Sequence, residues 1–258
     1  MARPWRPTPL VAASVAFHGA GLGALALQPA VAPWVLGAWV ANHVVLATSG
    51  MTPRSSLLGA NRTRLVDGAG QVGLSFDDGP DPAVTPAVLD LLDRYRARAS
   101  FFLIGERVAR HPELAAEICR RGHRVENHTW SHPAFFCCLG PGGARRQLLA
   151  TNEIIATTTG VQPSQFRPPA GLRQPWLEPV LADLDLDLVS WTRRGFDTAD
   201  GRPERVQRRV TEGLGAGEIV LLHDGNAART ASGRPVVLEV LPRVLETLAA
   251  KGWSAVAT

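Results

Sequence analysis

The sequence predicts a parallel α/β domain that follows an N-terminal helical hairpin. Downstream of residue 70, seven strand-like apolar runs alternate with helix-like stretches, which is the pattern of a parallel α/β fold. Upstream, 47 consecutive residues between Arg6 and Arg54 contain no Asp, Glu, Lys or Arg. The chain has 258 residues and is 45% hydrophobic, so it can bury a sizeable core and is not a disordered or low-complexity protein.

The uncharged stretch predicts two transmembrane helices. It divides at Gln28-Pro29 and Pro33 into apolar segments at residues 8–28 and 34–48, and a membrane span needs about 20 apolar residues. Arginines flank both ends of the stretch and none lies in the turn. The positive-inside rule therefore places both ends, and the domain that follows, on the cytoplasmic face of a bacterial-type inner membrane.

Two other interpretations of this stretch stay open at the level of sequence. Residues 1–26 have the basic start and small-residue end of a signal peptide, which would export the domain. That interpretation leaves the second apolar segment unexplained. Alternatively, the two segments form a buried helical pair in a soluble protein.

The net charge of +4 lies entirely in the first 70 residues, where five arginines face one aspartate, Asp67. The other 188 residues are formally neutral, so the basic balance gives no support for a nucleic-acid partner. Three cysteines are too few for a disulfide scaffold. We expect a membrane-anchoring hairpin at 1–52, a basic connector at 53–70 and the α/β domain at 71–258.

The expected strands and helices of this domain follow from apolar runs and helical spacing. Strands are expected at residues 72–76, 100–104, 124–127, 165–167, 186–191, 219–223 and 254–257. Helices are expected at 84–95, 112–121, 142–159, 174–184, 203–214 and 236–250, several with Pro near the start. Periodicity does not distinguish a barrel from a doubly wound sheet, but in both folds the working residues gather at the carboxyl ends of the strands.

An acidic pair ends the first strand. Asp77 and Asp78 stand in Ser-Phe-Asp-Asp-Gly-Pro, where a rigid Gly-Pro turn holds two carboxylates that point in different directions. One carboxylate can therefore bind a metal ion while the other takes up a proton.

A histidine pair follows the third strand. His128 and His132 are spaced i to i+4 in His-Thr-Trp-Ser-His, and one helical turn would bring both imidazoles to the same side. With Asp78 they form a set of two His and one carboxylate that leaves positions open for water and substrate. Zinc is the first choice of metal, and cobalt, nickel or iron fit the same ligands. Without the acidic pair, a solvated or helix-capping role would be the simpler interpretation.

Three more polar residues follow later strands. Arg167 precedes a stiff Pro-Pro turn, Asp197 lies in the loop after the fifth strand, and His223 ends the apolar run Ile-Val-Leu-Leu. Alone, Arg167 is most simply a surface arginine, and His223 is either a structural histidine or a proton donor that faces the cleft.

In this order, the motifs resemble those of the polysaccharide deacetylases of carbohydrate esterase family four, which share the NodB-homology domain. The resemblance covers residues 70–258 and rests on Ser-Phe-Asp-Asp-Gly-Pro together with Asn-His-Thr-Trp-Ser-His. It implies a distorted (β/α)7-type barrel and metal-dependent hydrolysis of an N-acyl group from an amino sugar. It also implies that Asp77 is the general base, oriented by Arg167, and that Asp78, His128 and His132 hold the metal.

The same resemblance implies roles in leaving-group and substrate binding. His223 would be the general acid, with Asp197 as its partner carboxylate. The backbone N–H of Ala170 would stabilise the oxyanion, Leu221 would line the pocket for the acyl methyl group, and Arg194 at the cleft mouth would bind an anionic group such as a lipid-linked phosphate.

The chain departs from the family pattern at two motifs. Ala170 stands where the family often has an aromatic residue before the glycine, so a wall for stacking the sugar is missing. The motif around Asp197 lacks its tryptophan and follows an inserted Arg193-Arg194 pair. These changes concern the sugar subsite and leave the hydrolytic residues in place.

The leading hypothesis is therefore a membrane-anchored, metal-dependent hydrolase that removes an acetyl or formyl group from an N-acylated amino-sugar glycan or glycolipid, in its most specific form a polyprenyl-phosphate-linked one. One alternative is an exported N-deacetylase of peptidoglycan or chitooligosaccharides. Another is a non-catalytic carbohydrate-binding relic of the fold, against which the presence of both Asp77 and His223 argues.

Overall fold

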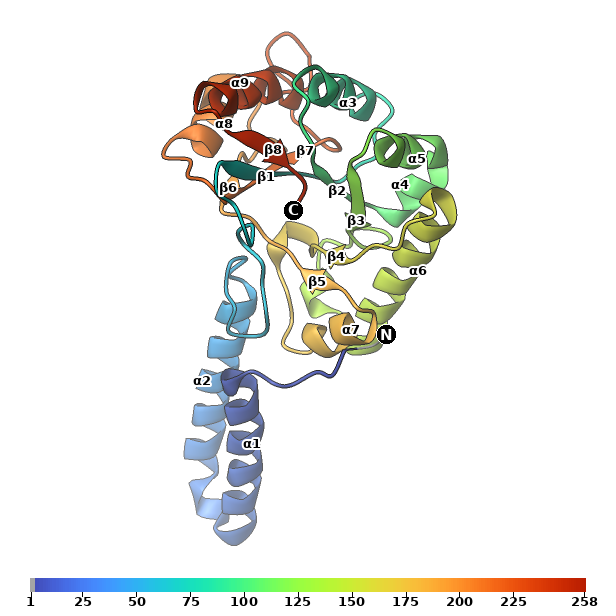
Figure 1. Ribbon diagram of the computed structural model, residues 1–258. Helices are drawn as coiled ribbons and strands as arrows, with labels where there is room; N and C mark the ends of the chain where they lie inside the picture. Colours follow the sequence, from blue (N-terminus) through green and yellow to red (C-terminus); the bar gives the residue numbers. More distant parts are fainter. Residues whose placement is uncertain (1–2) are drawn as a thin grey trace.

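The computed structural model describes residues 3–258 and consists of an α/β domain from which a long two-helix hairpin projects (Figure 1). The hairpin comprises α1 (Pro9–Leu27), the short 3-10 turn η1 (Pro29–Val31) and α2 (Ala32–Gly50). Proline stands in the first turn of each of these elements, where its missing N–H costs no hydrogen bond.

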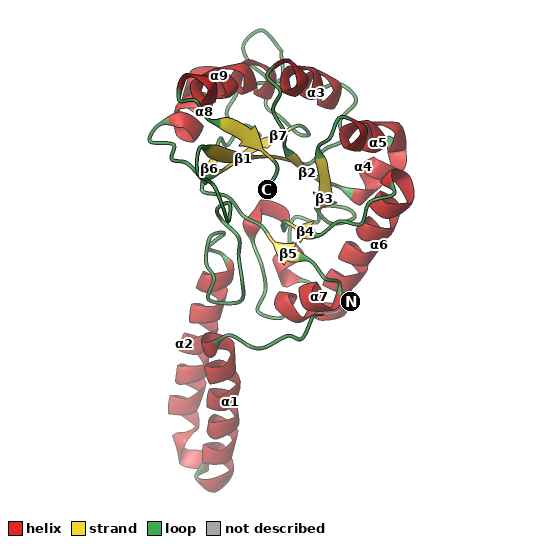
Figure 2. Ribbon diagram, in the orientation of Figure 1, coloured by secondary structure: helices red, strands yellow, loops and turns green. Residues whose placement is uncertain are grey.

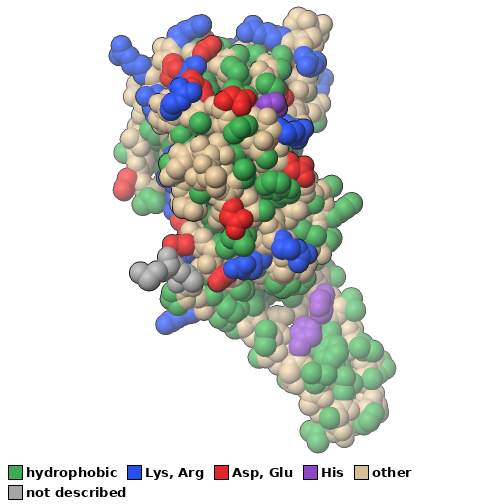
Figure 3. All heavy atoms as spheres, turned by 90° about the vertical axis from the view of Figure 1, so that its right-hand side faces the viewer, with side chains coloured by type: hydrophobic (Ala, Val, Ile, Leu, Met, Phe, Trp, Pro, Cys, Tyr) green, Lys and Arg blue, Asp and Glu red, His purple; other side chains and the backbone are tan. Residues whose placement is uncertain are grey.

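The two hairpin helices expose their apolar side chains. Leu27 is 89% exposed and Trp34 is 81% exposed, and charged side chains cover the α/β domain but not the hairpin in Figure 3. The candidate spans have 19 and 22 residues with mean hydropathies of 1.8 and 1.5, so both are long and apolar enough to cross a membrane. The structure contradicts the interpretation as a buried helical pair, because only 6% and 0% of the two windows are buried.

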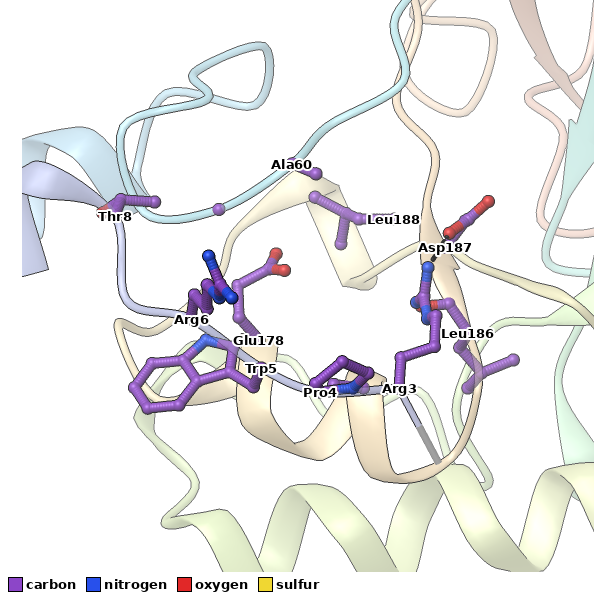
Figure 4. A pocket seen from close by; sticks show the side chains of 12 residues that line it. Arg3, Pro4, Trp5, Arg6, Thr8, Ala60, Glu178, Leu186, Asp187 and Leu188 are labelled. Atoms are coloured by element: carbon purple, nitrogen blue, oxygen red, sulfur yellow. Dashed lines mark hydrogen bonds and ion pairs between the residues drawn. The ribbon is translucent and has the colours of Figure 1, made fainter. Parts of the chain in front are cut away.

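Both ends of the hairpin are tied to the α/β domain. The N-terminal segment lies along α7 (Leu177–Asp183) (Figure 4), where the backbone N–H of Arg3 donates to Ala182 O at 2.9 Å and its guanidinium pairs with Asp187 at 2.5 Å. At the other end, the N–H of Arg173 donates to Gly50 O at 3.1 Å. The hairpin is therefore held in a defined place on the domain.

The α/β domain is a curled parallel sheet with helices on its outer face (Figure 2). The strand order is β5-β4-β3-β2-β1-β7-β6, and β8 also pairs with β1. The strands are β1 (Gln71–Asp77), β2 (Ser100–Leu103), β3 (Arg124–Asn127), β4 (Gln165–Phe166), β5 (Asp187–Leu188), β6 (Arg193–Arg194), β7 (Ile219–His223) and β8 (Ser254–Val256). The remaining helices are α3 (Thr85–Arg94), α4 (Gly105–Arg110), α5 (Pro112–Arg120), α6 (Pro141–Thr159), α8 (Pro203–Thr211) and α9 (Val237–Ala250), with 3-10 turns η2 (Phe136–Cys138) and η3 (Pro169–Gly171).

Residues 62–65 pair with segments on both sides of the sheet. Arg62 forms a bridge with Val189 after β5, and Arg64 forms one with Glu218 before β7. The N–H of Leu65 donates to Gly217 O at 2.9 Å. The expected connector at 53–70 is thus no free linker, because part of it pairs with the α/β domain.

Alternate strand residues build two cores. Phe101 and Leu103 belong to the cluster that packs with the outer helices, whereas Phe102 packs with Val189, Trp191 and other residues inside the barrel. The expected parallel barrel is confirmed, but the described residues contain eight strands rather than seven. The extra strand is β6, whose two arginines were expected to be an insertion relative to the family pattern. Helix α4 was also not expected.

Candidate active site

The carboxyl ends of β1, β3 and β7 meet around a pocket of about 210 Å³. Most of the site residues named from sequence line it. The lining consists of Asp77, Asp78, His128, His132, Ala170, Trp191, Arg194, Thr198, Leu221, His223 and Asn226. The two other named residues, Arg167 and Asp197, are fully buried and contact pocket residues from beneath. The fold thus brings together side chains as far apart in sequence as Asp77 and Asn226.

Asp78, His128 and His132 form a group with the composition of a metal site. Asp78 Oδ1 lies 3.3 Å from Nε2 of both histidines, and the three ligand atoms all lie within 4.8 Å of one another. Asp78 has a φ of +71°, a left-handed conformation that is uncommon for a residue other than glycine.

The donor set fits a divalent cation. Asp78 Oδ1 is a buried atom that accepts no hydrogen bond from any residue in the described part of the chain. His128 Nδ1 donates to Arg167 O at 2.6 Å, and because a carbonyl only accepts, the lone pair of the neutral ring is on Nε2. Burial alone would raise the pKa of Asp78, but the imidazoles of His128 and His132 that face its carboxylate, together with His223, lower it well below its ordinary value.

The histidine pair is brought together by a loop and not by the helical turn expected from its spacing. The residues from His128 to His132 are non-helical, with positive φ at Thr129 (69°) and His132 (49°). The His132 N–H donates to Thr129 Oγ1 at 3.1 Å, which stabilises this turn. The ring centroids still lie 4.9 Å apart.

Asp77 is fixed by a buried arginine. Arg167 Nη1 donates to Asp77 Oδ1 at 2.6 Å and to Ser75 Oγ at 3.0 Å, and its guanidinium lies 4.0 Å from the centre of the Phe102 ring. Burial lowers the pKa of Arg167, and the charge of Asp77 opposes that change. The simple interpretation of Arg167 as a surface residue is wrong, because its side chain is 0% exposed. Asp77 Oδ2, in contrast, faces His128 Nε2 at 3.8 Å.

His223 is fixed by Asp197. His223 Nδ1 lies 2.8 Å from Asp197 Oδ1, and the His223 backbone N–H donates to Asp197 Oδ2 at 2.7 Å. Burial lowers the pKa of His223, but the charge and hydrogen bond of Asp197 outweigh burial, so the pKa is raised. With Nδ1–H directed at a carboxylate, Nε2 is the nitrogen left for the pocket.

The residues that hold the acidic turn were not predicted from the sequence. Asn226 Nδ2 donates to Asp78 Oδ2 at 3.0 Å, and Arg107 donates to both Asp78 O at 2.8 Å and Asn226 Oδ1 at 2.7 Å. Asp224 is fully buried, accepts from Thr85 Oγ1 at 2.6 Å, and has a pKa that burial raises to about 7. Two of these residues, Asp224 and Asn226, could have been found from the sequence, because they stand in the polar run that directly follows the strand end at His223.

The predicted substrate-binding residues also reach the pocket. Ala170 stands in η3 with a φ of +56°, Leu221 forms part of the inner wall, and Arg194 lines the mouth. The neighbouring Arg193 does not line this pocket, and its Nε donates to Glu218 Oε2 at 2.6 Å.

Comparisons with known proteins agree with this geometry. Residues 66–189 match the family model described as polysaccharide deacetylase. The chain is 34% identical over 197 residues to a chitooligosaccharide deacetylase of a Bradyrhizobium species, which covers 73% of this chain and 89% of that protein. It is also 34% identical over 153 residues to the peptidoglycan-N-acetylmuramic acid deacetylase PdaC of Bacillus subtilis, covering 59% of this chain but only 32% of that longer protein.

Solved structures show the same fold. A family 4 carbohydrate esterase from Streptomyces lividans superposes with a TM-score of 0.65 at 32% identity, covering 73% of this chain and 92% of that one. A family pseudoenzyme from Bacillus anthracis, BA3943, superposes with a TM-score of 0.68 at 25% identity, covering 77% and 67%. This chain belongs to the polysaccharide deacetylase family, and its curled parallel barrel is a NodB-homology domain.

Proposed function

We propose that the protein is a metal-dependent hydrolase that removes an N-acyl group, acetyl or formyl, from an amino sugar. One observation carries this proposal: two proton-transfer groups, each fixed by a buried partner of opposite charge, line the same pocket as a three-ligand metal set. The named activities of its deacetylase relatives support it.

Asp78, His128 and His132 would hold the metal. Two imidazoles and one carboxylate with open coordination positions are typical of catalytic zinc sites, so zinc is our first choice over cobalt, nickel and iron. When bound, such an ion supplies Lewis-acid polarisation of the amide carbonyl and lowers the pKa of a water molecule.

Asp77 acts as the general base. Arg167 donates to Asp77 Oδ1 and holds the carboxylate in place, while Oδ2 on the pocket side accepts the proton of the attacking water. The water oxygen then forms its bond to the acyl carbon. The backbone N–H of Ala170 stabilises the resulting oxyanion, and Leu221 lines the space for the acyl methyl group.

His223 acts as the general acid. Asp197 holds the Nδ1–H and stabilises the imidazolium, so Nε2–H donates its proton to the sugar nitrogen as the carbon–nitrogen bond breaks. The products are a carboxylic acid and a free amino sugar, and the proton taken up by Asp77 balances the one that His223 has lost.

Replacement of His223 by Gln is expected to lower kcat by about 10²- to 10³-fold, because the leaving amine loses its proton donor.

Asp197→Asn should shift the alkaline limb of the pH–rate profile to lower pH, since the charge that raises the pKa of His223 is removed. Rates of acetate release between pH 5 and 9 check both. An Asp197→Asn profile that coincides with that of the wild type would contradict this pairing.

The finer proposal is that the substrate is a polyprenyl-phosphate-linked glycan at the cytoplasmic face of the inner membrane. The two exposed apolar helices support membrane anchoring, and the arginines that flank them support the orientation. An exported deacetylase of peptidoglycan or chitooligosaccharides is the second candidate, which the named substrates of the relatives favour.

Topology separates these two candidates. Thr258 is buried in the barrel, so a labelled loop is a better probe than a C-terminal fusion. Ser232→Cys, in a background without the three native cysteines, places a thiol on an exposed loop. We expect a membrane-impermeant maleimide to label it in inside-out vesicles and not in spheroplasts. Labelling in spheroplasts would contradict the cytoplasmic orientation.

The substrate class is tested by incubating the purified, zinc-loaded full chain with three substrates. They are a polyprenyl-phosphate-linked N-acetylamino sugar, chitotetraose and peptidoglycan. We expect acetate release to be fastest from the lipid-linked sugar. Faster release from the soluble polymers would assign the protein to the exported polymer class, and release from none of them at any zinc level would favour the non-catalytic relic.

A further inference from the structure

A second cavity, of about 460 Å³, adjoins the catalytic pocket. Trp191 and Arg194 line both. The remaining lining comes from Pro53, Arg54, Thr192, Arg193, Phe196 and Arg209. The part of the chain that the structure describes contributes four arginines and no acidic side chain to this lining. We call it the arginine cavity.

Two of the four arginines already have an acidic partner. Arg193 pairs with Glu218 at 2.6 Å and donates to the carbonyls of Glu212 and Gly213. Arg209 pairs with Asp200 at 3.1 Å. Their guanidinium groups are held by these contacts, so these two residues form the wall of the cavity.

The other two, Arg194 and Arg54, have no acidic partner within residues 3–258. Arg194 lies over the rings of Trp191 and Phe196, at 5.3 and 4.9 Å from their centres, and its buried Nε has no hydrogen-bond partner there. Arg54 makes a single long contact, from Nη1 to Thr192 O at 3.4 Å. A guanidinium that is stacked on aromatic rings and not paired is preorganised to bind an oxyanion in bidentate fashion.

The cavity lies between the catalytic pocket and the base of the hairpin. Arg54 follows the end of α2 by four residues, and the preceding Pro53 is fixed by a hydrogen bond from Ser190 Oγ to Pro53 O at 2.7 Å. One ligand can therefore reach from the pocket that holds its amide, past Trp191, to the membrane side of the domain.

We propose that Arg194 and Arg54 form a subsite for the phosphate of a glycosyl phosphate, the group that links the amino sugar to its lipid. This inference rests on the proposed function. A phospholipid headgroup presents the same phosphate ester, but the lining shared with the catalytic pocket favours a phosphate carried by the substrate itself.

The test is a binding measurement that needs no turnover. Full-length protein in detergent micelles is titrated with N-acetylglucosamine 1-phosphate and with the neutral methyl N-acetylglucosaminide. The variants are Arg194→Gln, Arg54→Gln and, as a matched control, Arg208→Gln on the exposed face of α8, which no described acidic residue pairs with. We expect the wild type to bind the sugar phosphate at least tenfold more tightly than the neutral sugar. Each cavity variant should reduce this preference by about tenfold, because a charge-assisted hydrogen bond is lost. Arg208→Gln should retain the preference.

Equal binding of the two sugars by the wild type, or an equal loss in Arg208→Gln, would overturn the subsite. The protein could instead bind vesicles containing phosphatidylglycerol more tightly than phosphatidylcholine vesicles and not discriminate between the two sugars. If Arg54→Gln abolishes that vesicle preference, the arginines bind membrane headgroups instead. Acetate release from the neutral glycoside is measured separately. If it occurs without phosphate discrimination, only the subsite fails, and if phosphate discrimination occurs without any acetate release, only the proposed function fails.

Discussion

Asp77→Asn is expected to lower kcat by about 10³-fold while leaving the metal stoichiometry unchanged, because the general base is lost and the metal ligands are not. Asn retains a carbonyl oxygen that can accept the hydrogen bond from Arg167 Nη1, which spans 2.6 Å in the wild type. The side chain therefore keeps its place but cannot take a proton from water. Initial rates of acetate release and elemental analysis of bound zinc check both halves of this expectation.

The matched control for this substitution is Asp90→Asn on α3, where an exposed carboxylate pairs with Arg121 and a surface ion pair contributes at most about 1 kcal/mol. Its rate should equal that of the wild type. A wild-type rate in Asp77→Asn would refute the assigned base, and loss of zinc together with activity would place Asp77 among the metal ligands.

His132→Gln is expected to weaken zinc binding by more than about 100-fold, since loss of a supporting outer-shell contact already costs about 10- to 100-fold and this change removes a proposed ligand itself. His132 is the more exposed of the two histidines, so its replacement perturbs the core less than replacement of His128 would. Competition with a zinc chelator gives the affinity, and acetate release at low zinc gives the loss of activity.

Excess zinc should partly restore the activity of His132→Gln, and it should not restore that of Asp77→Asn. The same zinc affinity in His132→Gln as in the wild type would mean that this residue does not hold the metal. A folding defect is distinguished by the circular dichroism spectrum, which the variant should share with the wild type.

The fold and most site positions were predictable because they depend on local patterns. Apolar runs that end in polar residues marked β1 and β7, and the parallel topology then placed those ends beside the end of β3. The uncharged stretch likewise marked α1 and α2, since an apolar run of this length is typical of membrane-spanning helices. The eighth strand was not predictable, because β6 consists of two arginines that join the sheet by pairing with β7.

The supporting contacts depend on tertiary structure, which spacing does not report. The proximity of His128 and His132 was expected for the wrong reason, since positive φ angles at Thr129 and His132 replace the helical turn. Arg167 belongs to a residue type that is mostly found at protein surfaces, and only the fold shows it buried against Asp77.

Docking of the hairpin had no signal in the sequence at all. Pro53 belongs to the stretch expected to link two independent parts, yet its carbonyl accepts a hydrogen bond from Ser190. This contact places Arg54 at the arginine cavity, and it explains why that residue was missed while Arg194 was named.

A single metal ion, held in the pocket shared by Asp77 and His223, is proposed to be required for amide hydrolysis. Titration of metal-free, full-length protein with zinc, with acetate release measured at each step, tests this requirement most directly. The rate should rise in proportion to bound zinc and reach its plateau at one ion per chain. A rate that is independent of zinc occupancy, or that remains at the uncatalysed level when the protein is saturated, would contradict the proposed metal dependence.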